Sequence, residues 1–338
     1  MTRILLTPNL PRSVRDLAAA LLPAGCTLEI MSAAHPGYAG ALAEAECLMG
    51  LPRARIDEAF LAHAPRLALI QLLRAGHDLV DLAAVGRAGI QIATVGDATS
   101  GIVAEHCLML MLALCRNLRA QHGAVVAGRW LEVKPWQLPS GDVDSVPEVR
   151  FDGLAGRTLG LLGVGKIGSR VARLAAAFGM TVRGLARRDG PPGPGDASDA
   201  GGERDGVPRV PLEELLETAD VVSLHLPLTA ATARIMDAAA FARMRPGAFL
   251  VNTARGELVD EAALLAALES GQLAGAALDT LAKEPPPPDH PLLGRADVLL
   301  TPHTAWLTRE SWRRTLEFGF ANVSRLRAGQ PLASCVSA

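Results

Sequence analysis

Four stretches of the sequence place a chemically reactive side chain on a loop that follows an expected strand. They are "VNTARGELVDE" with Arg255, "ALDT" with Asp279, "AKEPP" with Glu284 and "LLTPHTAW" with His303. An arginine can bind a carboxylate and stabilise negative charge on a carbonyl oxygen, and an imidazole beside a carboxylate can transfer a proton. Together these groups suit hydride transfer at a small carbonyl compound. Taken singly, each also has a plainer interpretation as a structural histidine or a surface ion pair.

A glycine pattern precedes these residues in "LGLLGVGKIGSRVARLAAAFG", where Gly163, Gly165 and Gly168 satisfy G-x-G-x-x-G. The spacing alone is weak because the chain contains 33 glycines. Its context is specific, since it follows the expected strand "TLGLL" and begins an expected helix. In a dinucleotide site the first glycine allows a tight turn, the second lets the pyrophosphate approach, and the third lets the helix pack on the strand.

The elements that must position these residues alternate between short apolar strands and helices. "RILLT", "CTLEIM", "LALIQLL" and "IQIATV" form a first series, and "TLGLL", "TVRGLA", "DVVSLHLP", "AFLVNTA", "GAALDT" and "DVLLTPH" form a second. This alternation predicts an α/β protein with parallel sheets, in which ligands bind at the carboxyl ends of the strands. One long apolar helix is expected from Ser100 to about His122, with a domain junction near its end. The Gly- and Pro-rich segment 189–208 is expected to be a surface loop without a core.

Composition narrows the class of protein. The 338 residues suffice for about two domains. The net charge of −2, with both signs intermixed, favours a small-molecule partner over nucleic acid or a membrane. Five scattered cysteines, with no CxxC spacing and no secretory leader, predict a reduced, cytoplasmic setting. The eight histidines form no metal-binding pattern, so we expect no metal.

These motifs, in this order, resemble those of the D-2-hydroxyacid dehydrogenase family, and in particular its glyoxylate and hydroxypyruvate reductases. The resemblance extends over nearly the whole chain and includes "LLRAGHDLVDLAAVGRAGI", "SGIVAEHCLMLMLALCR", "LAGRTLGLLGVGKIG", "MRPGAFLVNTARGELVDEAALLAAL" and "TPHTAW". It implies two Rossmann-like domains with parallel sheets and an active site in the cleft between them. Residues 1–118 and 304–338 would form a discontinuous, flavodoxin-like substrate domain, and residues 119–303 a dinucleotide-binding domain.

The resemblance also implies a role for each site residue. His303 would be the general acid/base, Glu284 its charged partner, and Arg255 the group that binds the substrate carboxylate and carbonyl oxygen. Backbone amides of Ala75 and Gly76 would hold the carboxylate from the other domain. The residues implied to bind the cofactor, besides His303, are Gly163, Gly165, Lys166, Ile167, Gly168, Ala186, Arg187, Arg188, Pro227, Thr253, Ala254 and Asp279, the last at the nicotinamide carboxamide.

The residues after "GMTVRGL" bear on the choice of cofactor. Ala186 stands where an NAD-type site places an aspartate for the ribose 2′-hydroxyl, and Arg187 and Arg188 follow it. Two arginines can bind a 2′-phosphate through charge-assisted hydrogen bonds, so the sequence favours NADP(H) over NAD(H). The alternative is that both arginines are solvated and that Asp189 binds the ribose, which would make the site an NAD site.

Three functions other than that of a 2-hydroxyacid dehydrogenase are alternatives for this pattern of residues. A corepressor of this fold would bind the dinucleotide as a sensor without significant turnover, and its site could keep the same three residues. Formate dehydrogenases carry glutamine where Glu284 stands and phosphite-oxidising relatives carry lysine where Ala75 stands, so both are disfavoured. Glyoxylate and hydroxypyruvate are the expected substrates, although the sequence fixes neither the 2-keto acid nor the direction of reaction. A homodimer is expected from the resemblance and from Trp130 and Trp136 in an apolar arm.

Overall fold

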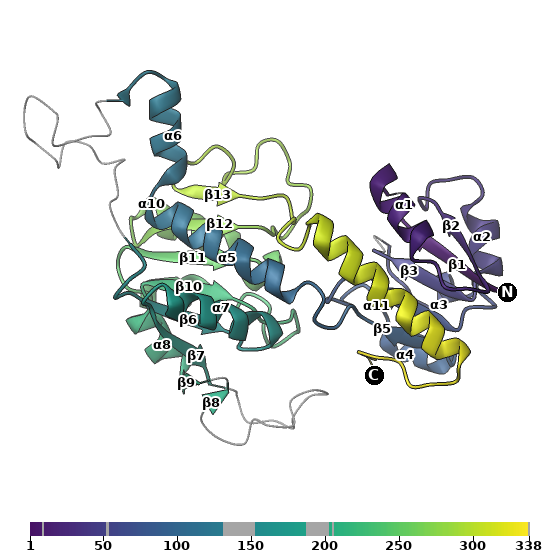
Figure 1. Ribbon diagram of the computed structural model, residues 1–338. Coiled ribbons are helices and arrows are strands. Elements are labelled where there is room, and N and C mark those ends of the chain that lie inside the picture. The colour runs from purple at the N-terminus through teal and green to yellow at the C-terminus, as the bar shows by residue number, and fades with distance from the viewer. Residues whose placement is uncertain (9, 52–53, 131–152, 187–202, 205, 337–338) are drawn as a thin grey trace, which may run out of the picture. The chain divides into compact units, whose positions relative to one another are not determined.

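The chain divides into two compact units. A computed structural model describes residues 1–8, 10–51, 54–130, 153–186, 203–204 and 206–336 (Figure 1). One unit comprises Met1–Thr99 together with Leu307–Ala338, and the other comprises Ser100–Trp306. The smaller unit is therefore discontinuous, but its first boundary lies at residue 99 and not near residue 118. The difference arises because the helix that begins at Ser100 packs on helices and strands of the larger unit.

The smaller unit contains a parallel five-stranded sheet with the order β2-β1-β3-β4-β5. Its strands are β1 (Thr2–Thr7), β2 (Cys26–Ile30), β3 (Cys47–Gly50), β4 (Leu69–Leu72) and β5 (Gln91–Ala93). Its helices are α1 (Arg12–Ala20), α2 (Tyr38–Glu44), α3 (Glu58–Leu61), α4 (Leu82–Arg87) and α11 (Arg309–Arg327). This strand order is that of flavodoxin-like folds and confirms the expected class.

The returning helix α11 is part of the core of the smaller unit. Asn322 lies on α11, and its Nδ2 donates to Oε1 of Gln71 on β4 at 2.8 Å. Gln71 and Asn322 are both fully buried. A Cβ atom on Gly319 would lie 3.0 Å from the side chain of Met49, so α11 packs tightly over β3. Helix α11, from the C-terminal part of the chain, thus covers a sheet whose first strand, β1, lies at the N-terminus.

The larger unit contains an eight-stranded sheet with the order β13-β12-β11-β10-β6-β7-β9-β8. Its strands are β6 (Thr158–Leu162), β7 (Thr181–Leu185), β8 (Glu203–Arg204), β9 (Val207–Val210), β10 (Val221–Leu224), β11 (Ala248–Asn252), β12 (Leu273–Leu278) and β13 (Val298–Leu300). All pairs are parallel except β8 with β9. The chain order reverses between β6 and β10, which is where doubly wound sheets bind their ligands.

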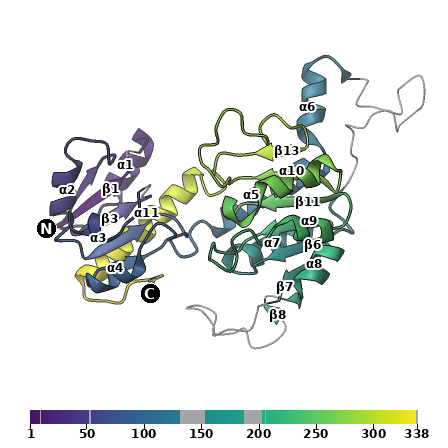
Figure 2. The same ribbon diagram turned by 180° about the vertical axis from the view of Figure 1, so that it is seen from behind.

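Helices cover both faces of this sheet. The helices on these faces are α5 (Ser100–Cys115), α7 (Lys166–Ala177), α8 (Leu212–Thr218), α9 (Ala238–Arg243) and α10 (Glu261–Glu269), and a further helix, α6 (Leu118–Val126), follows α5. Figure 1 shows α5 and α7 on one face, and Figure 2 shows α8, α9 and α10 on the other. Leu250 of β11 packs in the core with α8 to α10, whereas its neighbours Phe249 and Val251 pack in the core with α5 and α7. The strand is therefore apolar at every position because alternate side chains enter different cores.

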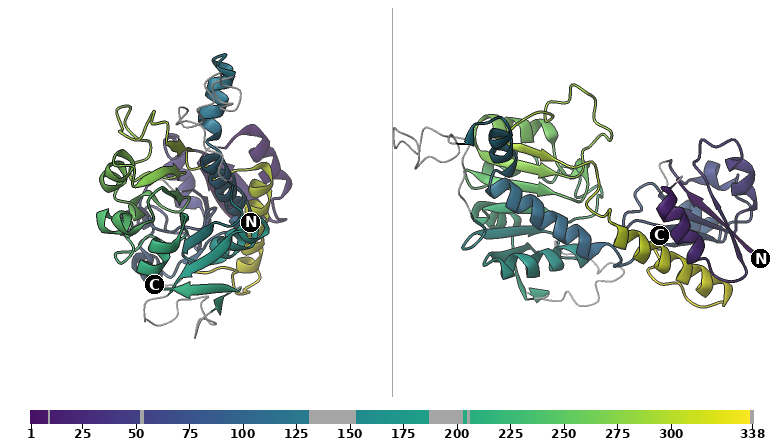
Figure 3. Two further views of the ribbon diagram at one scale, coloured as in Figure 1. Left: turned by 90° about the vertical axis from the view of Figure 1, so that its left-hand side faces the viewer. Right: turned by 45° about the horizontal axis from the view of Figure 1, so that its top comes forward.

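The prediction of a single helix over residues 100–122 is wrong, because this part of the chain forms two helices, α5 and α6. Asn117 adopts a left-handed backbone with φ of 46°, and the two helices meet at a bend of 62°. Figure 3 shows α6 projecting from the rest of its unit. No single described helix is long and apolar enough to cross a membrane, and α5 with α6 reaches that length only as this bent pair.

The prediction of a surface loop over residues 189–208 is wrong at the C-terminal end of that segment. Residues 187–202 and 205 lie outside the described part of the chain, but β8 and the start of β9 fall within the expected loop. Val207 and Val210 are buried, and β9 pairs with β7. The sequence "VPRV" is short and contains a proline, so its pattern alone does not indicate a strand.

Candidate active site

The glycine-rich turn between β6 and α7 has the geometry of a dinucleotide site. Gly163 has a φ of +104°, and a Cβ there would lie 2.7 Å from the carbonyl oxygen of His225. A Cβ on Gly168 would lie 2.2 Å from the carbonyl oxygen of Gly163, so the helix can approach the strand only because residue 168 is glycine. Gly165 caps α7, and no atom lies within 4 Å of its would-be Cβ. This open, helix-capping position suits the close approach of a pyrophosphate.

A neutral polar cluster, which the sequence analysis missed, lies beneath this turn. Nε2 of His225, after β10, lies 3.0 Å from Oγ of Ser223, and Sγ of Cys107 on α5 lies 3.2 Å from the same oxygen. Burial lowers the pKa of His225 to about 4. Burial also raises the pKa of the Cys107 thiol to about 12. Both groups therefore stay uncharged near neutral pH, and the backbone of His225 directly supports Gly163.

The end of β7 is where the adenosine ribose lies in dinucleotide folds. Ala186 follows β7, and its N–H donates to the carbonyl oxygen of Val210 at 2.7 Å. Nη1 of Arg209 donates to the carbonyl oxygen of Leu185 at 3.3 Å, which places this guanidinium beside the end of the strand. The sequence analysis did not select Arg209, since only the pairing of β9 with β7 brings it there.

Arg187 and Arg188, which the sequence analysis assigned to the same end of β7, lie outside the described residues.

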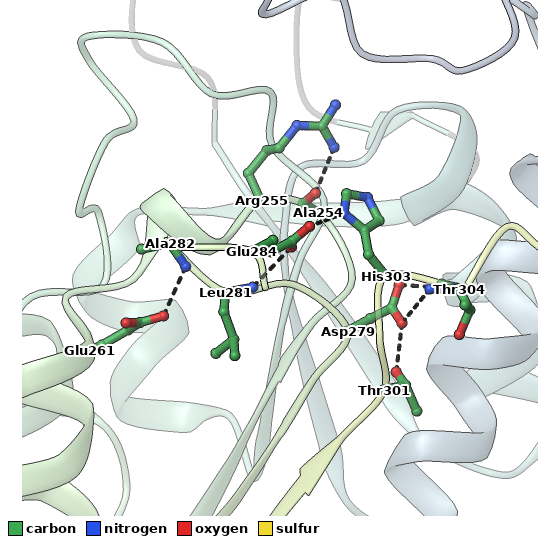
Figure 4. Close-up of polar contacts among 11 residues, drawn as sticks. Ala254, Arg255, Glu261, Asp279, Leu281, Ala282, Glu284, Thr301, His303 and Thr304 are labelled. Carbon is green, nitrogen blue, oxygen red and sulfur yellow. Dashed lines mark hydrogen bonds and ion pairs between the residues drawn. The ribbon is translucent and has the colours of Figure 1, made fainter. Parts of the chain in front are cut away.

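The three expected catalytic residues lie on loops after neighbouring strands. Asn252, Leu278 and Leu300, at the ends of β11, β12 and β13, occupy adjacent positions in the sheet. The loops that follow these strands carry Arg255, Glu284 and His303, and Figure 4 shows the three side chains gathered at this edge. The parallel sheet thus brings together residues that are up to 48 positions apart in the sequence.

His303 and Glu284 are in direct contact. Nδ1 of His303 lies 2.8 Å from Oε2 of Glu284, and the two side chains are 40% and 39% exposed. Oε1 of Glu284 accepts a hydrogen bond from the N–H of Leu281 at 3.1 Å, which orients the carboxylate. Since Nδ1 is directed to Glu284, Nε2 is the ring nitrogen that can face a reacting group. An accessible imidazole held by a carboxylate is suited to proton transfer.

Asp279 fixes the loop that carries His303. Its Oδ1 accepts hydrogen bonds from Oγ1 of Thr301 at 2.6 Å and the N–H of Thr304 at 2.9 Å, and its Oδ2 accepts from the N–H of Ala305 at 2.9 Å. Nε2 of His106 on α5 lies 3.1 Å from Oγ1 of Thr301. Asp279 is 2% exposed, and its carboxylate accepts hydrogen bonds from one side-chain hydroxyl and two backbone N–H groups. Its contact with a nicotinamide stays a prediction, and its structural role is one the sequence analysis did not foresee.

The loop that carries Arg255 is fixed in a similar way. Asn252 is fully buried, and its Nδ2 donates to the carbonyl oxygen of Arg255 at 2.7 Å while its Oδ1 accepts from the N–H of Ala254 at 3.0 Å. Gly256 begins the 3₁₀ turn η4 (Gly256–Leu258), and a Cβ there would lie 2.0 Å from the backbone of Leu281. Only glycine therefore lets the arginine loop lie against the glutamate loop.

The structure places the remaining expected residues at strand or helix ends. In the larger unit Lys166 and Ile167 begin α7, exposed Pro227 follows β10, and Thr253 and Ala254 follow β11. Ala75 and Gly76 follow β4 in the smaller unit, where Ala75 is exposed. Their roles toward cofactor and substrate stay predictions.

No group of three or more His, Cys, Asp or Glu side chains within the described ranges could hold a metal ion.

The residues present fit a nicotinamide dinucleotide. The open Gly165 position and the positive φ of Gly163 suit its pyrophosphate. At the catalytic end, Oγ1 of Thr280 is buried and has no hydrogen-bond partner within the described chain. A doubly wound sheet with this turn, and with an arginine and a histidine–carboxylate pair at the strand ends, defines the class of nicotinamide-dependent dehydrogenases.

Comparison with known proteins gives the family. Residues 108–305 match the family described as "D-isomer specific 2-hydroxyacid dehydrogenase, NAD binding domain". A putative 2-hydroxyacid dehydrogenase of Haemophilus influenzae is 37% identical over 257 residues, which cover 74% of this chain and 74% of that protein. A glyoxylate reductase of Korarchaeum cryptofilum is 34% identical over 292 residues, which cover 85% of this chain and 81% of that protein. The chain belongs to the D-isomer specific 2-hydroxyacid dehydrogenase family.

A solved structure agrees with this assignment. The glyoxylate reductase from Paecilomyes thermophila superposes with a TM-score of 0.79 at 28% identity, over 99% of this chain and 98% of that one. The expected family and the expected class of enzyme are therefore confirmed. The protein is an oxidoreductase that acts on CH–OH groups with a nicotinamide cofactor.

Proposed function

We propose that this enzyme reduces small 2-keto acids, such as glyoxylate or hydroxypyruvate, to D-2-hydroxy acids, and that it prefers NADPH to NADH. The observation that carries the proposal is the 2.8 Å contact between His303 and Glu284 on loops beside that of Arg255. Two of the similar proteins described above are named glyoxylate reductases, which supports glyoxylate as a substrate.

Each side chain has a distinct task in this reaction. A nicotinamide, when bound, would supply the hydride for the keto carbon. The guanidinium of Arg255 binds the substrate carboxylate and stabilises the negative charge that builds on the carbonyl oxygen. His303 donates a proton to that oxygen from Nε2. Oε2 of Glu284, 2.8 Å from Nδ1, holds the ring so that Nε2 can face the substrate.

The preference for NADPH rests on the residues at the end of β7. Ala186 cannot accept a hydrogen bond from a ribose 2′-hydroxyl through its side chain, and it lacks the negative charge that repels a 2′-phosphate. The guanidinium of Arg209 lies beside the same strand end, where it adds positive charge. Arg187 and Arg188 follow in sequence.

A homodimer is the second part of the proposal. Leu118 and Val126 of α6 are 59% and 72% exposed, and Trp130 just beyond is 52% exposed. Leu118 and Val126 lie on a helix that projects from its unit, as Figure 3 shows, and Trp130 follows this helix, so a second copy could bury these apolar side chains. Light scattering at micromolar concentration should give the mass of a dimer, and a monomer would reject this part of the proposal.

A steady-state assay tests the activity directly. A panel of 2-keto acids is supplied with NADPH and with NADH, and kcat/KM is measured for each pair. We expect turnover of small 2-keto acids with a higher kcat/KM for NADPH. A protein that binds the dinucleotide only as a sensor would turn over none of them appreciably.

A further inference from the structure

A second set of polar contacts holds the glutamate loop from the side away from His303. Glu261 is the first residue of α10, and its Oε1 accepts a hydrogen bond from the N–H of Ala282 at 2.9 Å (Figure 4). Its Oε2 lies 3.2 Å from Nε2 of His290. Ala282 precedes Glu284 by two positions and His290 follows it by six. One carboxylate thus contacts the loop on both sides of the residue that faces His303.

Glu261 and His290, which anchor the glutamate loop, are more buried than the pair of side chains that they support. The side chains of Glu261 and His290 are 22% and 10% exposed, whereas those of Glu284 and His303 are 39% and 40% exposed. The anchor itself is fixed, because Asp260 caps α10 by accepting hydrogen bonds from the N–H groups of Ala262 and Ala263.

We propose that Glu261, held by His290, is a positioning residue that sets the contact between Glu284 and His303. The inference rests on the proposed function, in which Glu284 orients the imidazole of His303. Without Glu261 the N–H of Ala282 and the imidazole of His290 lose their partner, and the loop is free to turn the Glu284 carboxylate away. If Glu261 only stabilised the N-terminus of α10, its replacement would lower the free energy of unfolding and leave the contact between Glu284 and His303 unchanged.

The test compares three variants at the two ends of α10. Glu261→Ala removes both contacts, and Glu261→Gln keeps an oxygen that can accept from Ala282. Glu269→Ala removes an exposed carboxylate at the other end of α10, where its partner Arg295 is 4.0 Å away. We expect Glu261→Ala to lower kcat about tenfold, with KM for NADPH unchanged. Glu261→Gln should recover most of the rate, and Glu269→Ala should behave as the wild type.

A double-mutant cycle distinguishes action through Glu284 from a separate effect. In the Glu284→Gln background, Glu261→Ala should cause no further loss of kcat. A full additional loss of kcat in the double variant, or an unchanged kcat with only a lower Tm in Glu261→Ala, would overturn the inference.

A measurement without substrate keeps this inference separate from the proposed function. Histidine NMR of the free enzyme follows the imidazole signals of His303, which are assigned by their loss in His303→Ala. The chemical shifts of these signals should change in Glu261→Ala, because Nδ1 loses its contact with Glu284. If that change occurs but the wild type reduces no 2-keto acid, the proposed function fails and the positioning role stands. If the wild type is active and the signals do not move, the positioning role fails alone.

Discussion

The backbone N–H of His303 donates a hydrogen bond to the carbonyl oxygen of Asp279 at 2.7 Å. The carboxylate of Asp279 accepts from the N–H groups of Thr304 and Ala305, so a single residue holds the backbone at and after the histidine. His303 has a φ of 55°, a left-handed conformation that costs a non-glycine residue about 1 kcal/mol or more. The hydrogen bonds of Asp279 offset that cost and fix the direction of the imidazole.

Replacing Asp279 with asparagine should therefore misplace His303, the proposed proton donor. One carboxylate oxygen becomes an amide NH₂ that faces a backbone donor, so a hydrogen bond is lost and two donors oppose each other. We expect the free energy of unfolding to fall by about 1–3 kcal/mol and kcat by about tenfold to a hundredfold. Urea unfolding and steady-state kinetics measure the two effects. A variant with wild-type kcat would show that Asp279 does not position His303.

His303→Ala removes the proposed proton donor while leaving Arg255 and Glu284 in place. If the imidazole supplies general acid catalysis, kcat should fall by at least roughly a hundredfold. Binding of NADPH to the free enzyme, followed by fluorescence, serves as the control and should change little. Near-wild-type turnover would exclude His303 as the acid.

Glu284→Gln keeps the size of the side chain but removes its charge. The contact at 2.8 Å with Nδ1 of His303 then loses its charge-assisted character, so the imidazole is held less firmly. We expect kcat for reduction to fall about tenfold with little change in KM. An unchanged kcat would count against a role for this pair in the reaction.

Replacing Arg187 and Arg188 with alanine tests the cofactor preference. Charge-assisted hydrogen bonds contribute roughly 1.5–3 kcal/mol each, so kcat/KM for NADPH should fall at least about tenfold. The value for NADH should stay nearly constant, because NADH carries no 2′-phosphate. A wild-type enzyme that uses NADH as well as NADPH would contradict the preference before any variant is made.

His225 makes folding stability depend on pH. Its pKa of about 4 in the folded protein lies below the ordinary 6.5, so the unfolded chain binds a proton first as the pH falls. The stabilisation is complete above pH 6.5 and is lost progressively as the pH falls toward 4, by about 3 kcal/mol in total. His225→Gln keeps a polar atom near Ser223 but does not titrate. Chemical unfolding from pH 7 to 4 should therefore show a shallower loss in the variant, and equal slopes would reject the role of His225.

The sheet and the glycine turn were predictable because they depend on local pattern. A strand such as β11 is apolar at each position, and Gly163 and Gly168 satisfy steric needs that recur wherever this turn is built. The same reasoning located Arg255, Glu284 and His303, each just beyond a strand end. The family resemblance then supplied their expected roles.

The residues that hold these side chains in place were not predictable in this way. Asn252, Glu261 and Thr301 act through hydrogen bonds to loops whose shape is set by the tertiary structure. The break at Asn117 was missed because the apolar run continues to Cys115 and nothing local requires a left-handed residue after it. The unit boundary at residue 99 depends on which sheet α5 packs against, which its composition does not encode.

The discontinuity of the smaller unit has a consequence for the order of events during synthesis. Its sheet begins with β1, yet Gln71 on β4 obtains its partner Asn322 only when α11 has been made. The larger unit is one uninterrupted stretch, so every contact inside it becomes possible before α11 emerges from the ribosome. Domains generally fold as units, with the N-terminal domain first. In this chain the inserted unit can finish first, and the unit that contains the N-terminus must wait for the last helix.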